Sequence, residues 1–425
     1  MRKSAILLTL VGLVVRVLFA ALEPAAQLVG DEHTWRGWAL ELLTPEVRFD
    51  PAASRILFYP PLYPYFLAAL HGLTGSWTLV KLAQAALGAL LVPAVVRVTA
   101  HAMGERAAVA AGVIAAVYPD LVWFSAHFWS ETLFLVLLWW GFERLLAAQR
   151  SGARAAALAA GLLWGLATLT RETALYFIPL AALWLWEARR EVRTAAAYAL
   201  AAALVILPWT WRNSVVWDAF VPVSTAGGLN LWQGNARMTR EEVYAEYAKV
   251  PGRVAKYRYA REKGIEAIRE RQPEWLLEKL RGEMPRFWEA DSLALAHIDR
   301  GAYGAVQPSF RRAAGFVFVA PYLALLLPFA LGVACIGWSR ASGLLLGFLI
   351  FHNLLHVATH GFARYRLPIL PVVFAFATAA LAEARWRRLS PRRLVVAALV
   401  AGILGASVAP SLREALPEEE AGPSS

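Results

Sequence analysis

Apolar runs of about twenty residues alternate with short polar segments along most of the chain. A membrane-spanning helix needs roughly 20 mostly apolar residues, and these runs approach or reach that length. The pattern therefore predicts an all-α polytopic membrane protein with about eleven transmembrane helices. The expected spans lie near residues 5–22, 77–99, 107–125, 129–148, 154–170, 173–187, 194–211, 313–336, 343–359, 367–384 and 394–410.

The composition supports this class and argues against others. Hydrophobic residues make up 59% of the 425 residues, and the mean hydropathy is +0.48. The 18 Trp residues suit a protein with two membrane–water interfaces. The net charge of +11 comes mainly from short clusters between apolar runs, so it does not indicate a nucleic-acid partner. The single cysteine, Cys335, excludes an intramolecular disulfide framework and a cysteine-based metal cluster.

The basic clusters orient the chain, because cytoplasmic loops are rich in Lys and Arg. With the N-terminus in the cytoplasm, the inner loops hold Arg2, Lys3, Arg97, Arg106, Arg144, Arg150, Arg154, Arg189, Arg190, Arg193, Arg340, Arg385, Arg387, Arg388, Arg392 and Arg393. We therefore expect a multi-pass protein of an inner (plasma) membrane. A cleaved signal peptide is the rival interpretation of Met1–Leu22, but Arg16 inside the apolar run and the many later spans argue against it.

This orientation divides the chain into four parts. Residues 1–212 form an N-terminal membrane module, whose first outer loop is 23–76. Residues 213–312 form an outer helical subdomain with two amphipathic helices broken at Gln272–Pro273; it either lies against the membrane or simply connects the spans. Residues 313–410 form the C-terminal transmembrane helices, and 411–425 a disordered tail.

Polar residues stand out at the outer ends of the spans. A charged group at membrane depth costs on the order of 2.5–3.5 kcal/mol, so such groups tend to face a cavity with a function. The outer set comprises Asp31, Glu32, Tyr59, Glu131, Arg171, Glu172, Arg364 and Arg366. Structural alternatives remain: Arg171 and Glu172 as an ion pair, and Arg364 and Arg366 as interface anchors. Arg16, inside the first span, either snorkels outward or reaches the Asp31–Glu32 region.

Three histidines follow one another at intervals of four residues: His352, His356 and His360. This spacing places them on one face of a helix, where they suit either a metal ion or ordinary helix packing. The local sequence supplies no carboxylate partner, which favours packing.

Carboxylates and arginines in one outer cavity suit a substrate that carries a phosphate and a nucleophile that must be deprotonated. If that substrate is a sugar on a polyprenyl phosphate, the leaving phosphate departs as an anion and needs cations rather than a general acid. Asp31 is the candidate base for the acceptor hydroxyl, and a single displacement predicts inversion at the anomeric carbon. A divalent metal (Mg, Mn or Zn) shared by Asp31 and Glu131 would be another source of positive charge.

Several segments together resemble a known family. These are "GDEHTW", "YPPLYPYFLAALHGLTG", "SETLF", "LTRE", "PWTWRN", "VPVSTAGGLNLWQGN" and "RYRLPILP". Their order is similar to that of C-superfamily membrane glycosyltransferases, in the branch of bacterial protein O-mannosyltransferases and aminoarabinose transferases. The resemblance spans most of the chain. It implies a polyprenyl-phosphate-linked sugar donor and an active site on the outer, periplasmic side.

The resemblance also implies roles for individual residues. Asp31 corresponds to the catalytic acid, with Glu32 beside it, and Glu131 to an acid that contacts acceptor or metal. Glu172 is assigned to the same acceptor or metal group. Donor phosphate is assigned to Arg171, Arg364, Arg366 and Tyr59. One departure concerns Tyr59, because aminoarabinose transferases carry a lysine at that place. A phenol cannot neutralise a phosphate, so either the donor or the way the protein binds its phosphate differs from that of the aminoarabinose transferases.

We therefore predict an integral membrane glycosyltransferase (hexosyl or pentosyl) acting on an acceptor hydroxyl of a protein, lipid or glycan. The alternatives are a polysaccharide polymerase or ligase, a membrane transporter or lipid flippase, and a binding scaffold. We find no internal repeat typical of transporters, and the polar residues gather outside the membrane midplane.

Overall fold

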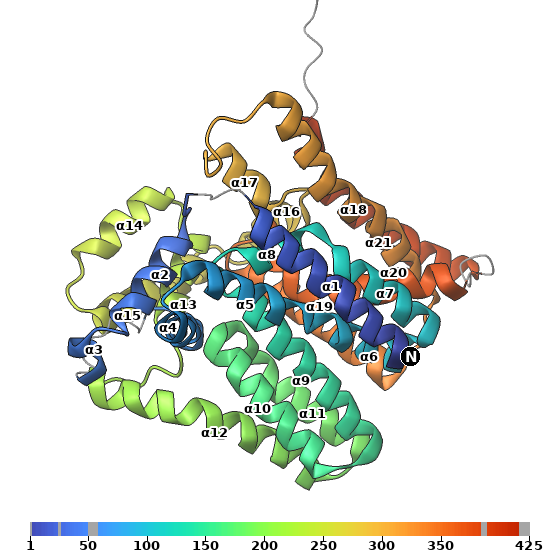
Figure 1. The fold of residues 1–425 in the computed structure, drawn as a ribbon, viewed down its shortest axis with the longest axis horizontal. Coiled ribbons are helices and arrows are strands. Elements are labelled where there is room, and N and C mark those ends of the chain that lie inside the picture. The colour runs from blue at the N-terminus through green and yellow to red at the C-terminus, as the bar shows by residue number, and fades with distance from the viewer. Residues whose placement is uncertain (1, 24–26, 50–57, 384–388, 416–425) are drawn as a thin grey trace, which may run out of the picture.

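The structure, a computed structural model, describes residues 2–23, 27–49, 58–383 and 389–415. Every regular element in those ranges is a helix, in agreement with the predicted all-α class (Figure 1). The first half contains α1 (Arg2–Leu22), α2 (Asp31–Glu41), α3 (Pro45–Phe49), α4 (Leu62–Thr74), α5 (Trp77–Ala89), α6 (Leu91–Met103), α7 (Glu105–Val117), α8 (Pro119–Ala126), α9 (Glu131–Ser151), α10 (Arg154–Thr170), η1 (Glu172–Phe177), α11 (Ile178–Arg189) and α12 (Val192–Trp217).

The second half begins with short helices and returns to long ones. It contains α13 (Ala226–Asn235), α14 (Arg240–Lys249), α15 (Arg253–Arg269), α16 (Glu274–Trp288), α17 (Leu293–Asp299), α18 (Pro308–Cys335), α19 (Arg340–Ala358), η2 (Ala363–Ile369), α20 (Leu370–Glu383) and α21 (Pro391–Ala415). The last helix corrects one prediction, because residues 411–415 of the expected disordered tail are helical. The rest of that tail, from 416, lies outside the described residues.

Each of the eleven expected spans coincides with helix in the described residues. Within the described ranges, seven helical segments are long and apolar enough to cross a membrane: 2–22, 77–103, 192–217, 308–335, 340–358, 363–382 and 391–412. The pair α7 and α8, bent by 45°, makes an eighth candidate. Helices α9, α10 and α11 account for the other three predicted spans but are shorter or more polar. The chain is a multi-pass membrane protein, while the number eleven stays a prediction.

The bend between α7 and α8 explains Arg16. Pro119 has no N–H, so the carbonyl of Ala115 loses its helical donor. The Arg16 side chain is 1% exposed and donates to the Ala115 carbonyl at 2.9 Å and to the Ala116 carbonyl at 2.7 Å. Arg16 therefore neither snorkels outward nor reaches Asp31, because it satisfies backbone carbonyls at the break.

Helices α9, α10 and α12 pack side by side and carry the turn after α10 to a fixed place. Gly161 and Gly165 of α10 face α12, and an added Cβ at either position would collide with the backbone of Tyr198 or Ala202. This close approach positions Arg171, the residue after α10, and η1 behind it.

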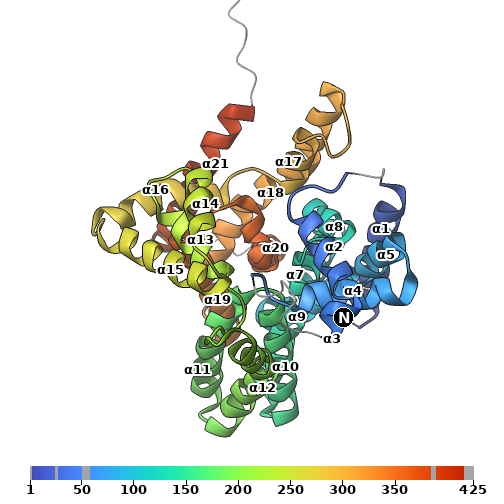
Figure 2. The same ribbon diagram turned by 90° about the vertical axis from the view of Figure 1, so that its left-hand side faces the viewer.

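The short helices collect at one end of the molecule, away from the start of α1. Figures 1 and 2 show α2, α4 and α13–α15 together at that end. The two amphipathic helices expected around Gln272–Pro273 are α15 and α16. Helix α16 packs against α19, η2 and α21, and buries Phe287 and Trp288. The α13–α17 region is thus anchored on the spanning helices through α16.

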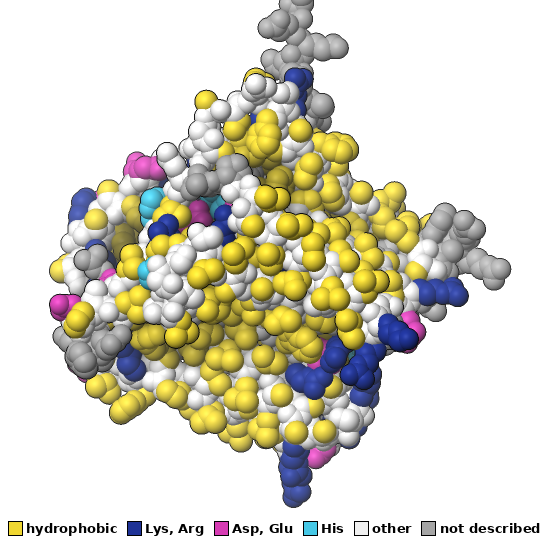
Figure 3. Space-filling view, in the orientation of Figure 1, with side chains coloured by type: hydrophobic (Ala, Val, Ile, Leu, Met, Phe, Trp, Pro, Cys, Tyr) yellow, Lys and Arg dark blue, Asp and Glu magenta, His cyan; other side chains and the backbone are white. Residues whose placement is uncertain are grey.

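The surface has a broad apolar zone and two polar ends. Figure 3 shows hydrophobic side chains across most of the visible helical face, with Lys and Arg near the start of α1. At the other end, charged and histidine side chains show in a hollow near α2 and α14. That hollow leads to the candidate site.

Candidate active site

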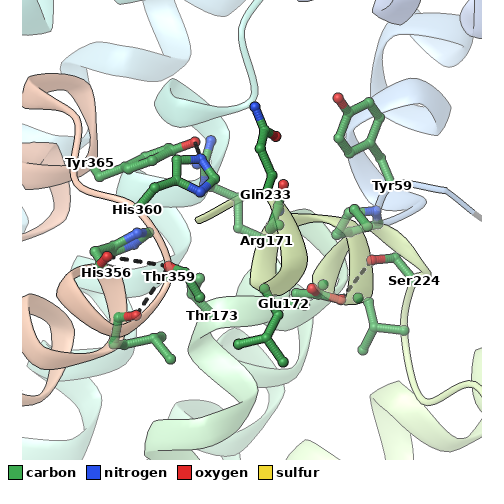
Figure 4. A pocket seen from close by; sticks show the side chains of 18 of the residues that line it. Tyr59, Arg171, Glu172, Thr173, Ser224, Gln233, His356, Thr359, His360 and Tyr365 are labelled. Carbon is green, nitrogen blue, oxygen red and sulfur yellow. Dashed lines mark hydrogen bonds between the residues drawn. The ribbon is translucent and has the colours of Figure 1, made fainter. Parts of the chain in front are cut away.

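A cavity of about 410 Å³ lies where the short helices α2 and α13–α15 meet the ends of the spanning helices. Its walls come from the start of α2, the segment before α4, the α10–η1 turn, α13, α14, α15, the end of α19 and η2. Figure 4 shows His360 and Tyr365 on one side, with Tyr59 and Ser224 on the other. Of the predicted set, the cavity lining includes Asp31, Tyr59, Arg171, Glu172 and Arg364.

Asp31 is the most accessible carboxylate of the predicted pair. It begins α2 directly after Gly30, whose φ of 62° favours glycine. Its Oδ2 lies 3.5 Å from Nη1 of Arg364, and its side chain is 35% exposed. Arg364 stacks on Trp129 and Tyr365, at 5.0 and 5.1 Å from the ring centres. Asp31 is therefore oriented by a fixed cation and still open to a ligand.

A second ion pair lies behind the cavity wall. Glu131 begins α9 and is 3% exposed, and its Oε1 accepts a hydrogen bond of 2.7 Å from Nη1 of Arg171. Its other oxygen, Oε2, is buried without a hydrogen-bond partner among the described residues. The partner of Arg171 is thus Glu131, and the proposed Arg171–Glu172 pair does not form.

Glu172 faces a different wall of the cavity. Its Oε2 accepts a hydrogen bond of 2.6 Å from the Ser224 hydroxyl. Burial raises the pKa of Glu172 to about 7, and the Ser224 bond offsets only part of this effect. Gly227 makes room for the carboxylate, because an added Cβ would lie 2.6 Å from Oε1. Near neutral pH this side chain can therefore donate as well as accept a hydrogen bond.

Tyr59 belongs to an aromatic group formed with α2. Its ring centre lies 5.0 Å from that of Trp35 and 5.4 Å from that of Trp38. Burial raises the pKa of its phenol well above the ordinary value, so the hydroxyl stays protonated. Tyr59 therefore offers a hydrogen bond and a flat apolar face to a ligand.

Glu32 does not reach the cavity. It is 2% exposed and accepts hydrogen bonds from the amides of Val29 and Phe128. His297 lies 3.4 Å from its Oε2. Burial alone would raise its pKa, but His297, His127 and the two amides outweigh burial and lower it. We correct its predicted catalytic role, since Glu32 ties α2 to the α8–α9 loop and α17.

Arg366 also points away from the cavity. It is 4% exposed and donates to the backbone carbonyls of Glu289 and Asp291. Its guanidinium also stacks on Tyr322 at 3.9 Å. The geometry contradicts a phosphate-binding role and makes Arg366 a support for the segment between α16 and α17.

Other cavity residues had no role in the sequence prediction. Arg240, Tyr244, Tyr257 and Arg261 of α14 and α15 all line the cavity. Among the described residues, no carboxylate lies within ion-pairing distance (4.0 Å) of Arg240 or Arg261. Their only sequence signal was charge on amphipathic helices, which does not tell a ligand-facing arginine from a solvated one.

The three histidines pack together instead of clustering with acids. The rings of His352 and His356 lie 4.6 Å apart, and His356 stacks on Tyr365 at 4.4 Å. Nε2 of His352 lies 2.8 Å from the Tyr365 carbonyl. Burial lowers the pKa of His360 to about 4, so its ring is neutral. These contacts favour the packing alternative.

The predicted Asp31–Glu131 metal site does not fit the observed contacts. Each carboxylate already has a guanidinium partner, Arg364 or Arg171. A divalent cation between them would stand beside two positive charges. Within the part of the chain that the structure describes, no three His, Cys, Asp or Glu side chains come together as metal ligands.

Comparisons with known proteins found one matching family and several solved structures with a similar fold. Residues 59–211 match the family described as dolichyl-phosphate-mannose-protein mannosyltransferase. The archaeal oligosaccharyltransferase AglB from Archaeoglobus fulgidus, in complex with an inhibitory peptide and a dolichol-phosphate, shares the fold, with a TM-score of 0.55 and 16% identity. The alignment covers 96% of this chain and 54% of that one. The family match covers less than half of the chain, and the structural match shows a shared fold.

Two further structures extend the comparison. The zinc and sulfate complex of the Archaeoglobus fulgidus oligosaccharyltransferase has 14% identity and a TM-score of 0.52, with coverage of 94% of this chain and 53% of that one. ArnT from Cupriavidus metallidurans, bound to undecaprenyl phosphate, has 19% identity and a TM-score of 0.42, with coverage of 90% and 77%. The chain spans about half the length of the oligosaccharyltransferase. No curated protein sequence matches it.

Proposed function

We propose that this protein is a membrane glycosyltransferase that moves a sugar from a polyprenyl-phosphate donor to an acceptor hydroxyl. One observation carries the proposal: a single cavity holds the accessible carboxylate of Asp31 and guanidinium groups from four separate segments. The dolichol-phosphate in the oligosaccharyltransferase of the same fold supports a lipid phosphate as the donor carrier.

The phosphate should go to the cations that are still unpaired. Arg171 and Arg364 are neutralised by Glu131 and Asp31. Arg240 and Arg261 face the cavity with no carboxylate partner among the described residues. A departing phosphate gains more from an unpaired guanidinium than from one already in an ion pair. We therefore assign the donor phosphate to Arg240 and Arg261, with hydrogen bonds from Tyr59 and Tyr244.

Asp31 is the group placed to take the acceptor proton. The acceptor hydroxyl donates to the free oxygen of Asp31, and its oxygen attacks the anomeric carbon as the carbon–phosphate-oxygen bond breaks. The proton passes to Asp31, and the electron pair leaves with the phosphate. One displacement of this kind inverts the anomeric centre. Arg364 keeps Asp31 oriented, and Glu172 offers a hydrogen bond to a sugar or acceptor hydroxyl.

The charge distribution supports an outer active site. Lys and Arg gather at the end of the molecule where α1 begins (Figure 3), and the cavity lies at the opposite end. The positive-inside rule then assigns the N-terminus to the cytoplasm and the cavity to the outer face of an inner (plasma) membrane.

The test uses purified protein in lipid nanodiscs with a panel of polyprenyl-phosphate sugars and membrane extract as the acceptor source. Mass spectrometry follows release of polyprenyl phosphate. We expect release from one donor, reduced about 10²–10⁴-fold in Asp31→Asn. Glu46→Gln, an exposed acid of the same loop outside the cavity, is the matched control and should stay active. Release that survives in Asp31→Asn would show that Asp31 is not the base. No release from any donor would favour a transporter or flippase.

The phosphate assignment has its own readout. Arg240→Gln and Arg261→Gln should raise the donor KM, whereas Arg258→Gln, one turn away on α15 and outside the cavity lining, should not. An unchanged KM in both cavity variants would return the phosphate to Arg171 and Arg364.

A further inference from the structure

A second cavity, of about 670 Å³, lies far from the candidate active site, at the end where α1 begins. It is a groove between α1, α6 and α9, and it shares no lining residue with the first cavity. Its lining consists of Arg2, Ala5, Ile6, Thr9, Leu10, Pro93, Val96, Arg97 and Trp140. We call it the α1–α6 groove.

The two arginines of this groove come from α1 and α6 and lie at different depths along it. An added Cβ on Gly12 would lie 3.0 Å from Val92, and one on Gly112 would touch both Leu8 and Val96. Residues 12 and 92 are thus level, as are 8 and 96, so α1 and α6 run antiparallel. In this register Arg97 is level with about residue 7 of α1, so along the helix axis it lies roughly 7–8 Å further in than Arg2 at 1.5 Å per residue. Leu10 and Pro93 lie further in than both arginines.

The groove opens sideways from the bundle. Ile6 and Leu10 are 55% and 52% exposed, although they belong to the most apolar candidate span. The positions from Arg2 to Leu10 on α1 cover about 12 Å at helical rise. An apolar trough of this length, open toward the membrane, suits part of an acyl chain.

The basic side chains of the groove keep a positive excess. Arg97 pairs with Glu143 at 3.6 Å, and Arg144 donates to the same carboxylate at 2.7 Å. One acid is therefore shared by two arginines. Arg2 has no ion-pair partner among the described residues. Trp140 completes the wall, since its Nε1 donates to the Leu90 carbonyl and Arg97 lies 5.3 Å from its ring centre.

We propose that the α1–α6 groove binds one anionic phospholipid, with its phosphodiester on Arg2 and Arg97 and an acyl chain along Ile6, Leu10 and Val96. Basic pockets between membrane helices on the cytoplasmic side are suited to anionic head groups. A zwitterionic lipid carries its own cation and would gain less from the two arginines. The inference is independent of the proposed reaction.

Native mass spectrometry of the detergent-purified chain tests it directly. The probes are palmitoyl-oleoyl-phosphatidylglycerol and the phosphatidylcholine with the same chains. We expect preferential retention of one phosphatidylglycerol, weakened about 30-fold in Arg2→Gln/Arg97→Gln. Lys3→Gln/Arg106→Gln removes the same charge from the same end but outside the groove lining, and should keep the preference.

A second variant separates the groove from general surface charge. Ala5→Phe fills the trough and leaves both arginines in place, so it should also lose the bound phosphatidylglycerol while remaining monodisperse on size exclusion. Equal loss in the Lys3/Arg106 control, or full binding in Ala5→Phe, would overturn the proposal. Either result would mean that the lipid is attracted by surface charge and does not occupy the groove. Equal retention of the two lipids would overturn it as well.

Discussion

Replacing Arg171 with methionine removes the partner of a buried acid. Glu131 is 3% exposed, and its Oε2 already has no partner among the described residues. Breaking a buried ion pair by removing one member costs about 3–5 kcal/mol, because the other charge stays buried and unpaired. Arg171 is 22% exposed, so some water reaches the pair. We therefore expect the lower end, a loss of about 3 kcal/mol in the free energy of unfolding.

The assay is unfolding by dodecyl sulfate in mixed micelles, followed by tryptophan fluorescence, for wild type, Arg171→Met, Glu131→Gln and the double variant. The double variant removes both charges and should recover most of the loss, to within about 1 kcal/mol of wild type. The coupling from this cycle then measures the pair itself. A loss below about 1 kcal/mol in Arg171→Met alone would refute the reasoning, because Glu131 would then have another source of compensation.

Three further predictions follow from the same contacts. The pKa of Glu172 is about 7 in the folded chain against an ordinary 4.5, so its contribution to stability is full below pH 4.5 and is lost as pH rises to 7. The melting temperature of wild type relative to Glu172→Gln should accordingly fall between pH 5 and pH 8, and a constant difference would contradict the raised pKa. Arg16→Met should lower the free energy of unfolding by about 1–3 kcal/mol, since two carbonyls at the α7–α8 break lose their donor; an Arg16→Met chain as stable as wild type would show that the break needs no cap. Donor turnover should persist in excess chelator, because the Asp31 and Glu131 carboxylates are paired with arginines, and restoration of lost turnover by zinc or magnesium would reverse that conclusion.

Most helices were predictable because their apolar runs are long enough to stand out in the hydropathy pattern, whereas α9, α10 and α11 are shorter or more polar. The basic loops led us to group the polar residues on one side of the membrane, and Asp31, Tyr59, Glu172 and Arg364 from that group line one cavity. The hydropathy pattern did not predict which way each side chain points from its helix. Glu32 is next to Asp31, but one step along a helix turns a side chain by about 100° and sends it into the core.

Other parts of the site depend on tertiary contacts that leave no local signal. Arg366 is two residues from Arg364, and only the positions of the Glu289 and Asp291 carbonyls decide where its guanidinium goes. Arg240 and Arg261 became candidates only because α14 and α15 fold over the cavity. The partner of Arg16 lies 100 residues away, at a helix break that the apolar pattern does not reveal.

That last separation has a consequence for how the protein is made. At about 5–20 residues per second, the ribosome takes roughly 5–20 s to synthesise the chain between Arg16 and Ala116. During that delay α1 carries an arginine into the membrane before its carbonyl partners exist, at an insertion cost on the order of 2.5–3.5 kcal/mol. Helix α1 therefore enters the bilayer before Arg16 can donate to the Ala115 and Ala116 carbonyls, and these contacts form only when α7 and α8 have been inserted.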